Sequence, residues 1–182
     1  MNGIKQMFSL MLLVCLSSIS LIVSAEDDNA SPAMNNARLD TLIKRIDESA
    51  QGKDGFWRFI VEGREVSVIT DERADRMRVI VPVAPADKID RDKLFRMMQA
   101  NFDSALDARY SIAKDVLWGA YIHPLSSLDD KEFLSGLGQA VNLAVTYGES
   151  YSSGAIVFGG GDSGALNRRE LIDDLLRKGQ AI

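Results

Sequence analysis

The sequence predicts an α+β fold: an antiparallel sheet of about five strands packed with helices in the order α-β-β-β-α-β-β-α, followed by a short C-terminal helix. Two kinds of pattern predict it. Apolar residues recur at helical spacing in separate stretches, and runs rich in β-branched and aromatic residues lie between them. Short polar turns divide these runs into a meander of three strands and a hairpin of two, which are both antiparallel arrangements.

Residues 1–25 are typical of a secretory signal peptide. Lys5 precedes an apolar run from Met7 to Val23, and the run ends in a small-residue cleavage pattern at Ala25. We expect cleavage after Ala25 and a periplasmic or secreted protein, without stable membrane insertion after the signal is removed. The alternative is an uncleaved N-terminal anchor, because the run approaches the roughly 17 residues that a membrane span needs.

Removal of this leader leaves 157 residues, a size that fits one domain. The only cysteine, Cys15, lies in the middle of the apolar run after Val14, which is not the pattern of a lipoprotein. The mature chain is therefore expected to have no disulfide. Loss of Lys5 changes the formal charge from −5 to −6, and this acidity argues against nucleic acid as a partner.

Residues 26–36 are expected to form a flexible spacer, because Asp, Asn, Ser, Pro and Ala dominate them. The α+β domain is expected over residues 37–152. Its first helix has Asn36 as N-cap and a stop at Gly52. The apolar positions of this helix are Leu39, Leu42, Ile43 and Ile46.

The meander is expected at residues 56–62, 65–70 and 77–83. Trp57, Phe59 and Val61 alternate with charged residues, so helices are expected to cover one face of the sheet while the other face is partly wet. Pro82 and Pro85 cannot donate hydrogen bonds to a neighbouring strand. The third strand is therefore expected to end there or to lie at an edge.

The second helix is expected to begin after Asp90, whose side chain can cap free amides. The residues predicted on its apolar side are Leu94, Met97, Met98, Asn101, Phe102 and Ala105. A hairpin at residues 108–112 and 116–122 follows, with Lys114-Asp115 as its turn and a stop at Pro124.

The third helix is predicted to start with a capping box formed by Ser127 and Asp130. Its expected buried residues are Phe133, Leu137, Val141 and Ala144. Residues 153–164 are expected to form a glycine-rich linker. A C-terminal helix at residues 165–182 has a capping-box pattern at Asn167 and Glu170 and a stop at Gly179, and a helix this short must dock on this domain, a second copy or a partner.

Three segments carry a family resemblance: LFRMMQANF, ARYSIAKDVLWGAYIHPLSSLDDKEF and LSGLGQAV. Together they resemble the Tir chaperone (CesT) group of type III secretion chaperone-like domains, and the related YbjN-type domains, over roughly Leu39 to Tyr151. The resemblance implies a small acidic homodimer that holds an extended segment of another protein along its sheet and helix surfaces, without ATP. Those chaperones act in the cytoplasm, whereas an export signal precedes this domain, so the fold transfers better than the secretion role.

The candidate partner-binding residues are Trp57, Phe59, Trp118, Tyr121, Gly136 and Gly138. The four aromatic residues lie on strands, where they form either a groove for a partner or the core beneath the helices. The two glycines flank Leu137 in a helix, where glycine is unfavourable, and this indicates close approach of another backbone. That backbone belongs either to the same domain or to the second copy of a dimer.

Gly161-Asp162-Ser163-Gly164 resembles the nucleophile motif of trypsin-like proteases, and His123 is the only histidine. A serine nucleophile needs a base within hydrogen-bond reach and an acid that orients the base. The chain is too short for a double barrel, its glycines make the motif mobile, and His123 stands at a strand end before Pro124. We therefore expect no enzyme, with a small envelope serine hydrolase as the remote alternative.

Cofactors and metals are not expected either. No lysine follows the glycines at the spacing of a phosphate-binding loop, and Asp162 would repel an anion. With one histidine and no cysteine in the mature chain, Asp129-Asp130 is explained more simply as charge at a helix start. The sequence thus predicts an exported, non-enzymatic, chaperone-like protein-binding module that forms a homodimer. The alternative is a sensory or regulatory subunit of the cell envelope, with its final helix on a partner.

Overall fold

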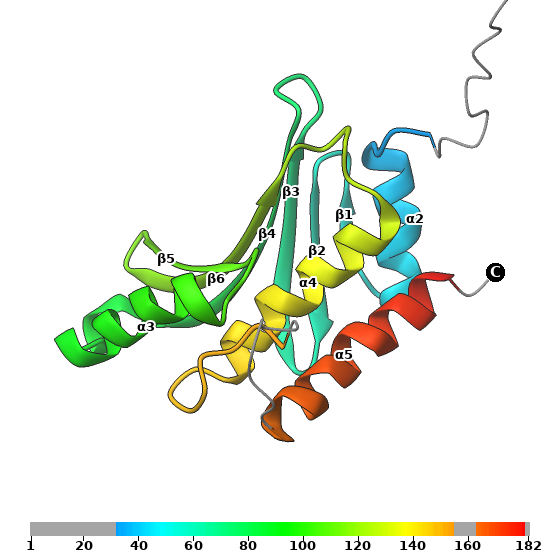
Figure 1. Cartoon of the computed structure of the whole chain (residues 1–182). Helices are drawn as coiled ribbons and strands as arrows, with labels where there is room; N and C mark the ends of the chain where they lie inside the picture. Colours follow the sequence, from blue (N-terminus) through cyan, green and yellow to red (C-terminus); the bar gives the residue numbers. More distant parts are fainter. Residues whose placement is uncertain (1–31, 155–162, 181–182) are drawn as a thin grey trace, which may run out of the picture. The chain divides into compact units, whose positions relative to one another are not determined.

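The computed structural model describes residues 32–154 and 163–180, apart from the side chains of residues 163–168. The predicted signal peptide, most of the predicted spacer and residues 155–162 lie outside the described part. The described elements are α2 (Asn36–Ile46), β1 (Gln51–Lys53), β2 (Phe56–Val61), β3 (Arg64–Asp71), β4 (Arg76–Pro85), a 3₁₀ turn (Ala86–Lys88), α3 (Arg91–Asp103), β5 (Arg109–Ala113), β6 (Val116–His123), α4 (Asp130–Val145) and α5 (Ser163–Gln180) (Figure 1).

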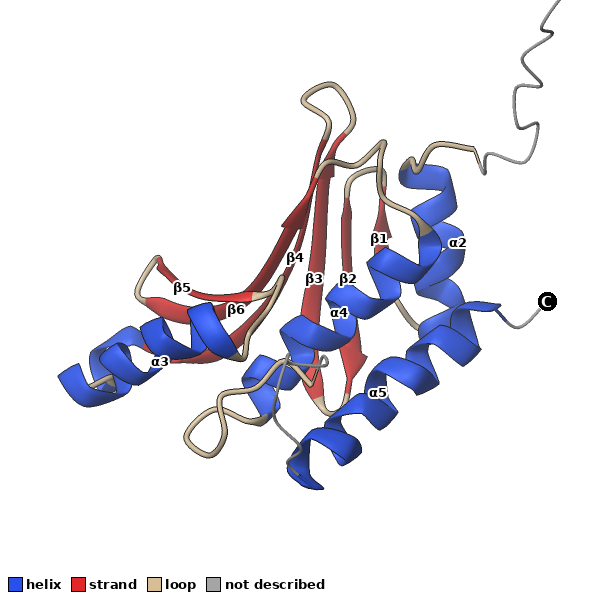
Figure 2. Ribbon diagram, in the orientation of Figure 1, coloured by secondary structure: helices blue, strands red, loops and turns tan. Residues whose placement is uncertain are grey.

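The predicted α+β class is confirmed, with one antiparallel sheet in the order β1-β2-β3-β4-β6-β5 (Figure 2). The described chain has six strands instead of about five. The additional strand, β1, pairs with β2 where the sequence predicted the end of the first helix. That helix, α2, already ends at Ile46, and Gly52 lies within β1 with a φ of +104°.

Helices α2, α4 and α5 lie on one face of the sheet (Figure 2). α4 packs against β4 and β6, and α5 packs on the outer side of α4. The side chains of Trp57, Phe59 and Val61 point to the helices and are buried, whereas Arg58 and Ile60 between them are exposed. The expected sheet with one covered face is therefore confirmed.

Helix α4 has the buried residues that the sequence predicts, but it begins with a different capping box. Phe133, Leu137 and Val141 are buried, together with most of the residues between them. The box is formed by Asp129 and Glu132 rather than by Ser127 and Asp130, with Glu132 N donating to Asp129 Oδ1 over 2.7 Å. The pattern fits both positions, and the structure selects the later one.

Strand β4 runs past Pro82 and ends at Pro85, the second of the two prolines at which an end was expected. It continues to Pro85 beside β6, with a bulge between Pro82 and Ala84. The ladder with β3 stops at Ile80, so Pro82 stands where β4 has a neighbour on one side only. The missing N–H of Pro82 is tolerated there for the reason that admits proline at sheet edges.

Helix α3 departs most from the prediction. Asp90 caps it as expected, with its Oδ1 accepting from Lys93 N over 2.8 Å. Of the predicted apolar side, however, Met97 is buried while Met98 is half exposed and Phe102 is 92% exposed. The helix lies beside the outer edge of β5, and its few buried residues contact the rest of the domain (Figure 1).

The structured domain extends beyond both predicted boundaries. Met34, in the predicted spacer, is buried in the core, and Asn35 rather than Asn36 caps α2 through its side chain. At the other end Ser153, assigned to the linker, is buried, and its N–H donates to Ser104 O over 3.0 Å.

Helix α5 begins two residues earlier than expected and docks on its own domain. It begins at Ser163, so Asn167 lies inside the helix rather than at its cap, and Gly179 lies within its last turn instead of ending it. A Cβ at Gly138 of α4 would lie 2.7 Å from Cγ1 of Ile172, which shows how closely the two helices approach. Leu175 of α5 is buried in the same core.

We predict that Gly119→Ala lowers the free energy of unfolding by about 1–3 kcal/mol, the usual cost of overpacking a core. A Cβ at Gly119 of β6 would lie 2.7 Å from the backbone oxygen of Ala140, and a backbone atom cannot move aside as a side chain can. Urea unfolding measures the change, with Ser111→Ala on the neighbouring strand as control. An unchanged midpoint for Gly119→Ala would contradict the close approach of β6 and α4.

A second prediction concerns Asp40, which accepts from Trp57 Nε1 over 2.9 Å and from Lys44 Nζ over 2.6 Å. Because the indole is fully buried, Asp40→Ala leaves its N–H unsatisfied and should cost about 1–3 kcal/mol. Asp40→Asn keeps an acceptor and should cost less. Equal losses in urea unfolding, followed by tryptophan fluorescence, would show that the hydrogen bond contributes nothing.

The same carboxylate makes stability depend on pH. The Lys44 ammonium and then the Trp57 indole hold the pKa of Asp40 below its usual range. A lowered pKa in the folded state stabilises the fold above the unfolded pKa of about 3.9, and this contribution disappears as the pH falls through the folded pKa. As the pH falls through the folded pKa, the free energy of unfolding should therefore decrease less in Asp40→Asn than in the unmutated protein.

Candidate functional site

The face of the sheet that points away from α4 carries apolar side chains, and we call it the open sheet face. One row across four strands is formed by Phe56, Ile69, Arg78 and Ile122, which are neighbours in register. Phe56 is 43% exposed and Ile122 is 57% exposed. A single exposed apolar residue is ordinary, whereas a contiguous set on one face marks a surface that another molecule can cover.

A groove of about 390 Å³ runs over this face between β3, β4, β6 and the β5–β6 turn. Its apolar residues are Ile69, Ile80, Ala113, Trp118, Ala120 and Ile122. Ala120 is buried at its floor, because the larger residues around it stand higher. The indole N–H of Trp118 donates to Ala113 O over 2.9 Å, so the ring presents only its apolar surface to the groove.

The groove is positively charged, although the whole chain has a formal charge of −5. Arg78 and Lys114 line it, and no carboxylate side chain does so among the described residues. Elsewhere on the face, Arg58 is paired with Glu65 at 3.4 Å. A ligand that fits the groove therefore combines apolar side chains with negative charge.

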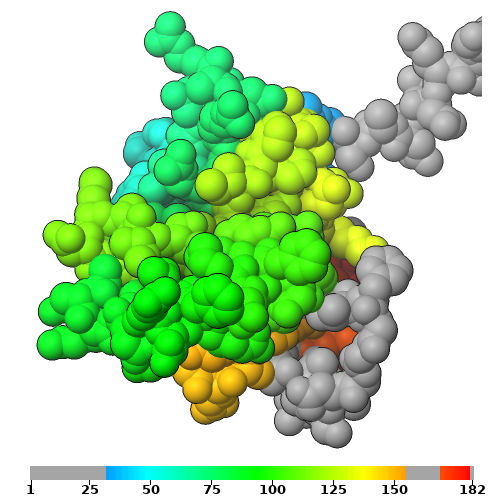
Figure 3. Space-filling model, turned by 60° about the vertical axis from the view of Figure 1, so that its left-hand side comes forward, coloured from blue at the N-terminus to red at the C-terminus, as the bar shows by residue number. Residues whose placement is uncertain are grey.

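A second exposed apolar surface lies on α3. Leu94, Phe95, Met98 and Phe102 are all exposed, and their spacing at 3.6 residues per turn places them on one side of the helix. We call these four residues the α3 stripe. Figure 3 shows α3 in green on the face that comes forward in that view, at the surface of the molecule.

The six predicted partner-binding residues do not form one surface. Trp57 and Phe59 are buried under the helices, and Tyr121 is buried on the same side of the sheet, so these three fill the core. Trp118 alone lies in the groove. Partner contact by these residues stays a prediction.

The two glycines of α4 are explained by packing within the domain. A Cβ at Gly136 would lie 2.3 Å from the Tyr121 ring, and one at Gly138 would meet Ile172 of α5. Of the two interpretations that the sequence left open, close approach inside one chain is the one that the structure shows. The glycines make room for a side chain on each side of α4.

Sequence reasoning missed the residues that dominate the open sheet face, among them Ile69, Ile80 and Ile122. A signal was present in β2, where Phe56 and Ile60 are apolar at positions that alternate with the buried Trp57 and Phe59. When apolar residues occupy both alternating sets of positions in a strand, the strand either is buried on both faces or exposes an apolar face.

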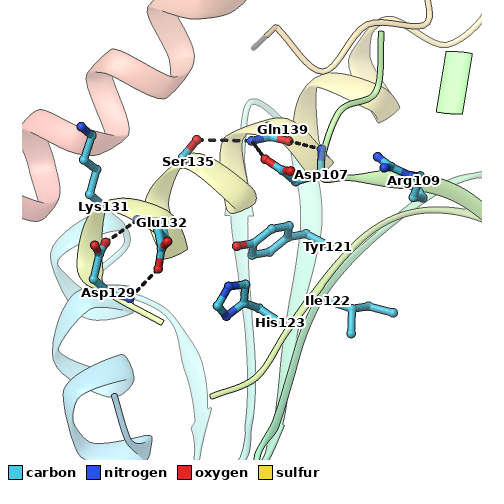
Figure 4. A pocket seen from close by; sticks show the side chains of 10 residues that line it. All are labelled: Asp107, Arg109, Tyr121, Ile122, His123, Asp129, Lys131, Glu132, Ser135 and Gln139. Carbon is cyan, nitrogen blue, oxygen red and sulfur yellow. Dashed lines mark hydrogen bonds between the residues drawn. The ribbon is translucent and has the colours of Figure 1, made fainter. Parts of the chain in front are cut away.

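A polar cleft of about 620 Å³ lies on the other side of the sheet, between the end of β6, the start of α4 and the chain before β5 (Figure 4). His123 lines it, with its Nδ1 2.8 Å from Pro124 O and its ring 6.0 Å from that of Tyr121. The motif proposed for a serine nucleophile falls on residues 161–162, which lie outside the described residues, and on Ser163 and Gly164, of which only the backbone is described.

The described residues contain no cluster suited to a metal ion and no helix suited to crossing a membrane. No group of three or more histidine, cysteine, aspartate or glutamate side chains there is placed to hold a metal ion. Within the same ranges, none of the helices has the length and apolar character that crossing a membrane requires.

No family model matches this sequence, and no curated protein sequence matches it. Solved structures are similar to it. A chain in the HopA1–SchA chaperone–effector complex has a TM-score of 0.48 at 12% identity, with 62% of this chain and 94% of that chain covered. A chain in the ExsC–ExsE complex has 0.48 at 14% identity, with 60% and 86% covered.

A third structure contains the Yersinia pestis type III secretion chaperone SycH with a stable fragment of YscM2. Its matching chain has a TM-score of 0.48 at 14% identity, with 62% of this chain and 98% of that chain covered. Type III secretion chaperones are the group that the sequence resembles. At such identities the likeness assigns no function to any residue, so the function has to be argued from the surfaces of this chain.

Proposed function

We propose that this protein is an exported, non-enzymatic, chaperone-like module that holds a segment of another polypeptide in the groove on the open sheet face. The observation that carries this proposal is the groove itself: apolar side chains from four strands line it, and all of them except Ala120 are exposed or half-buried. Covering apolar surface is favourable by roughly 25 cal/mol per Å². Because strands hold the groove in shape, little of that gain is lost in ordering it.

The partner segment is expected to lie across the strands rather than to extend the sheet. At the outer edge of β5, Asn101 of α3 already occupies the backbone: its Nδ2 donates to Tyr110 O over 3.1 Å and its Oδ1 accepts from Tyr110 N over 2.7 Å. The opposite edge, β1, offers only three residues. Strand addition needs a free row of N–H and C=O groups, so the face is the better site.

The charge of the groove selects among polypeptides. Arg78 and Lys114 favour carboxylates on the bound segment, and the isoleucines and Trp118 favour aliphatic side chains. Together they fit a segment with an apolar centre and acidic residues beside it. The charges contribute mainly to selectivity and association rate, whereas the apolar contacts contribute most of the affinity.

A homodimer is part of the proposal, with the α3 stripe as the surface between two copies. Phe102, at 92% exposed, and Phe95 are the largest exposed apolar side chains of the helix. No residue of the α3 stripe lines the groove, so a dimer through the stripe leaves the groove residues uncovered. Export through the N-terminal apolar run would place this dimer in the periplasm or outside the cell.

The alternative of a regulatory subunit that docks through its final helix has less support. That helix, α5, buries Ile172 and Leu175 against its own domain. Its apolar side is therefore already covered in the described part of the chain. A partner would have to displace α5 before binding it.

Fluorescence anisotropy tests the groove with two labelled peptides, Glu-Leu-Ile-Ile-Leu-Glu and the same sequence with lysine at both ends. The acidic peptide should bind tighter, and Ile122→Asp should weaken it by about tenfold, the effect of losing roughly 1.4 kcal/mol. The matched control is Ile112→Asp, which adds the same charge at an isoleucine that is 51% exposed outside the groove. Equal binding by the two variants, or equal binding of the two peptides, would reject the site.

Light scattering at micromolar concentration tests the dimer. The mature chain should run as a dimer, and Phe95→Glu with Phe102→Glu should give a monomer, because two buried charges at an apolar contact are unfavourable. Ile60→Glu changes an exposed apolar residue of the open sheet face and should leave the dimer intact. A monomeric unmutated chain would refute the homodimer, and a dimeric double variant would exclude the α3 stripe as its interface.

A further inference from the structure

The Tyr121 hydroxyl faces the polar cleft without a hydrogen-bond partner in the described part of the protein. Tyr121 is 6% exposed and lines the cleft, and its hydroxyl makes no hydrogen bond to any described residue. Figure 4 shows its side chain directed into the space between α4 and His123. Buried polar groups usually have partners, and one that faces a cavity is open to a ligand or to water.

The ring of Tyr121 is held so that its hydroxyl stays in the cleft. Gly136 of α4 lies directly against it, and a Cβ there would overlap the ring atoms at 2.3 to 2.5 Å. On its other side, the His123 ring stacks at 6.0 Å between centroids with an angle of 21°. The hydroxyl is therefore fixed in place by packing rather than by hydrogen bonds.

Carboxylates on two sides of the cleft are also held in place. At the start of α4, Asp129 and Glu132 hold each other through the capping box, at 2.7 and 3.0 Å. In the chain before β5, Asp107 Oδ2 accepts from Gln139 Nε2 over 3.2 Å. Gln139 is buried, and its Oε1 also accepts from the N–H groups of Asp107 and Ala108.

The cleft also has two cationic side chains, but neither offsets the carboxylates at the hydroxyl. Arg109 donates to its neighbour's carbonyl, Ala108 O, over 2.7 Å, and Lys131 extends away from Tyr121 (Figure 4). Burial, and after it the charges of Glu132, Asp107 and Asp129, raises the pKa of Tyr121 to about 12. The environment of the hydroxyl is therefore negative, and the phenol stays neutral at physiological pH.

We propose that this cleft binds an organic cation with N–H donors, an ammonium or guanidinium group, between Tyr121 and the carboxylates of Asp107, Asp129 and Glu132. The Tyr121 oxygen accepts one hydrogen bond and the carboxylates accept others, with charge assistance. This site shares only Ile122 with the groove and binds a different kind of group, so its test does not depend on the proposed function.

His123 supplies a built-in reporter, because it is the only histidine and its ring touches that of Tyr121. The full-length mature protein is titrated with n-butylguanidinium chloride while the ring signals of His123 are followed by proton–carbon NMR. A saturable shift is expected. Tetramethylammonium has the charge without N–H donors and should bind more weakly, and sodium chloride at equal ionic strength should give no saturable shift.

Two variants assign the response to the cleft. Tyr121→Phe removes only the hydroxyl and should weaken binding by about fivefold, as expected for the loss of one hydrogen bond of about 1 kcal/mol, without loss of stability. Glu132→Gln keeps the capping box but removes a charge and should also weaken binding. Glu149→Gln changes an exposed carboxylate outside the cleft and should have no effect.

A second titration distinguishes the source of the cation. If acetyl-Gly-Arg-Gly-amide binds tighter than n-butylguanidinium, the group enters on a polypeptide, and if it binds no tighter, a free organic cation is the ligand. The site itself is rejected if n-butylguanidinium gives no saturable shift, if tetramethylammonium binds equally well, or if both cleft variants behave like the unmutated protein.

Discussion

The close contact between α4 and the sheet is the constraint on which the rest of the structure depends. Gly119 brings the backbone of β6 against that of α4, and Gly136 admits the ring of Tyr121 at the same interface. α4 is buried on almost all sides because α5 covers its outer surface. With one helix this close to β6 and β4, the large apolar residues of the covered face are buried, and no helix in the described part of the chain covers the opposite face.

This arrangement divides the surface into regions with different chemistry. The open sheet face offers isoleucine and tryptophan beside cationic side chains, whereas the polar cleft on the covered side gathers carboxylates around a tyrosine. The two hollows meet only at Ile122, at the end of β6. The two regions therefore differ in charge as well as in the side of the sheet on which they lie.

The sequence predicted the strands well because the alternation in β2 and β3 reports directly which residues are covered. It predicted α4 for the same reason, since Phe133 and Leu137 lie on a side that packing must bury.

Strand β1 could not be predicted, because none of its residues, Gln51, Gly52 and Lys53, is apolar and they are ordered only by pairing with β2. The exposure of the apolar side of α3 could not be predicted either. The spacing of apolar residues shows that one side of a helix is apolar, but it does not show which part of the protein covers that side. The polar cleft could not be predicted from the sequence, because its lining residues come from three separate segments of the chain.

The amide of Asn101 has a consequence for solubility. By bonding to both backbone groups of Tyr110, it substitutes for one residue of a seventh strand. Exposed strand borders are templates for uncontrolled lateral growth into fibres, and proteins suppress this with obstacles at the border. A domain with exposed isoleucines on one sheet face can remain soluble at high concentration only if its sheet edges are closed to further chains. The side chain of Asn101 contributes to that closure from the neighbouring helix.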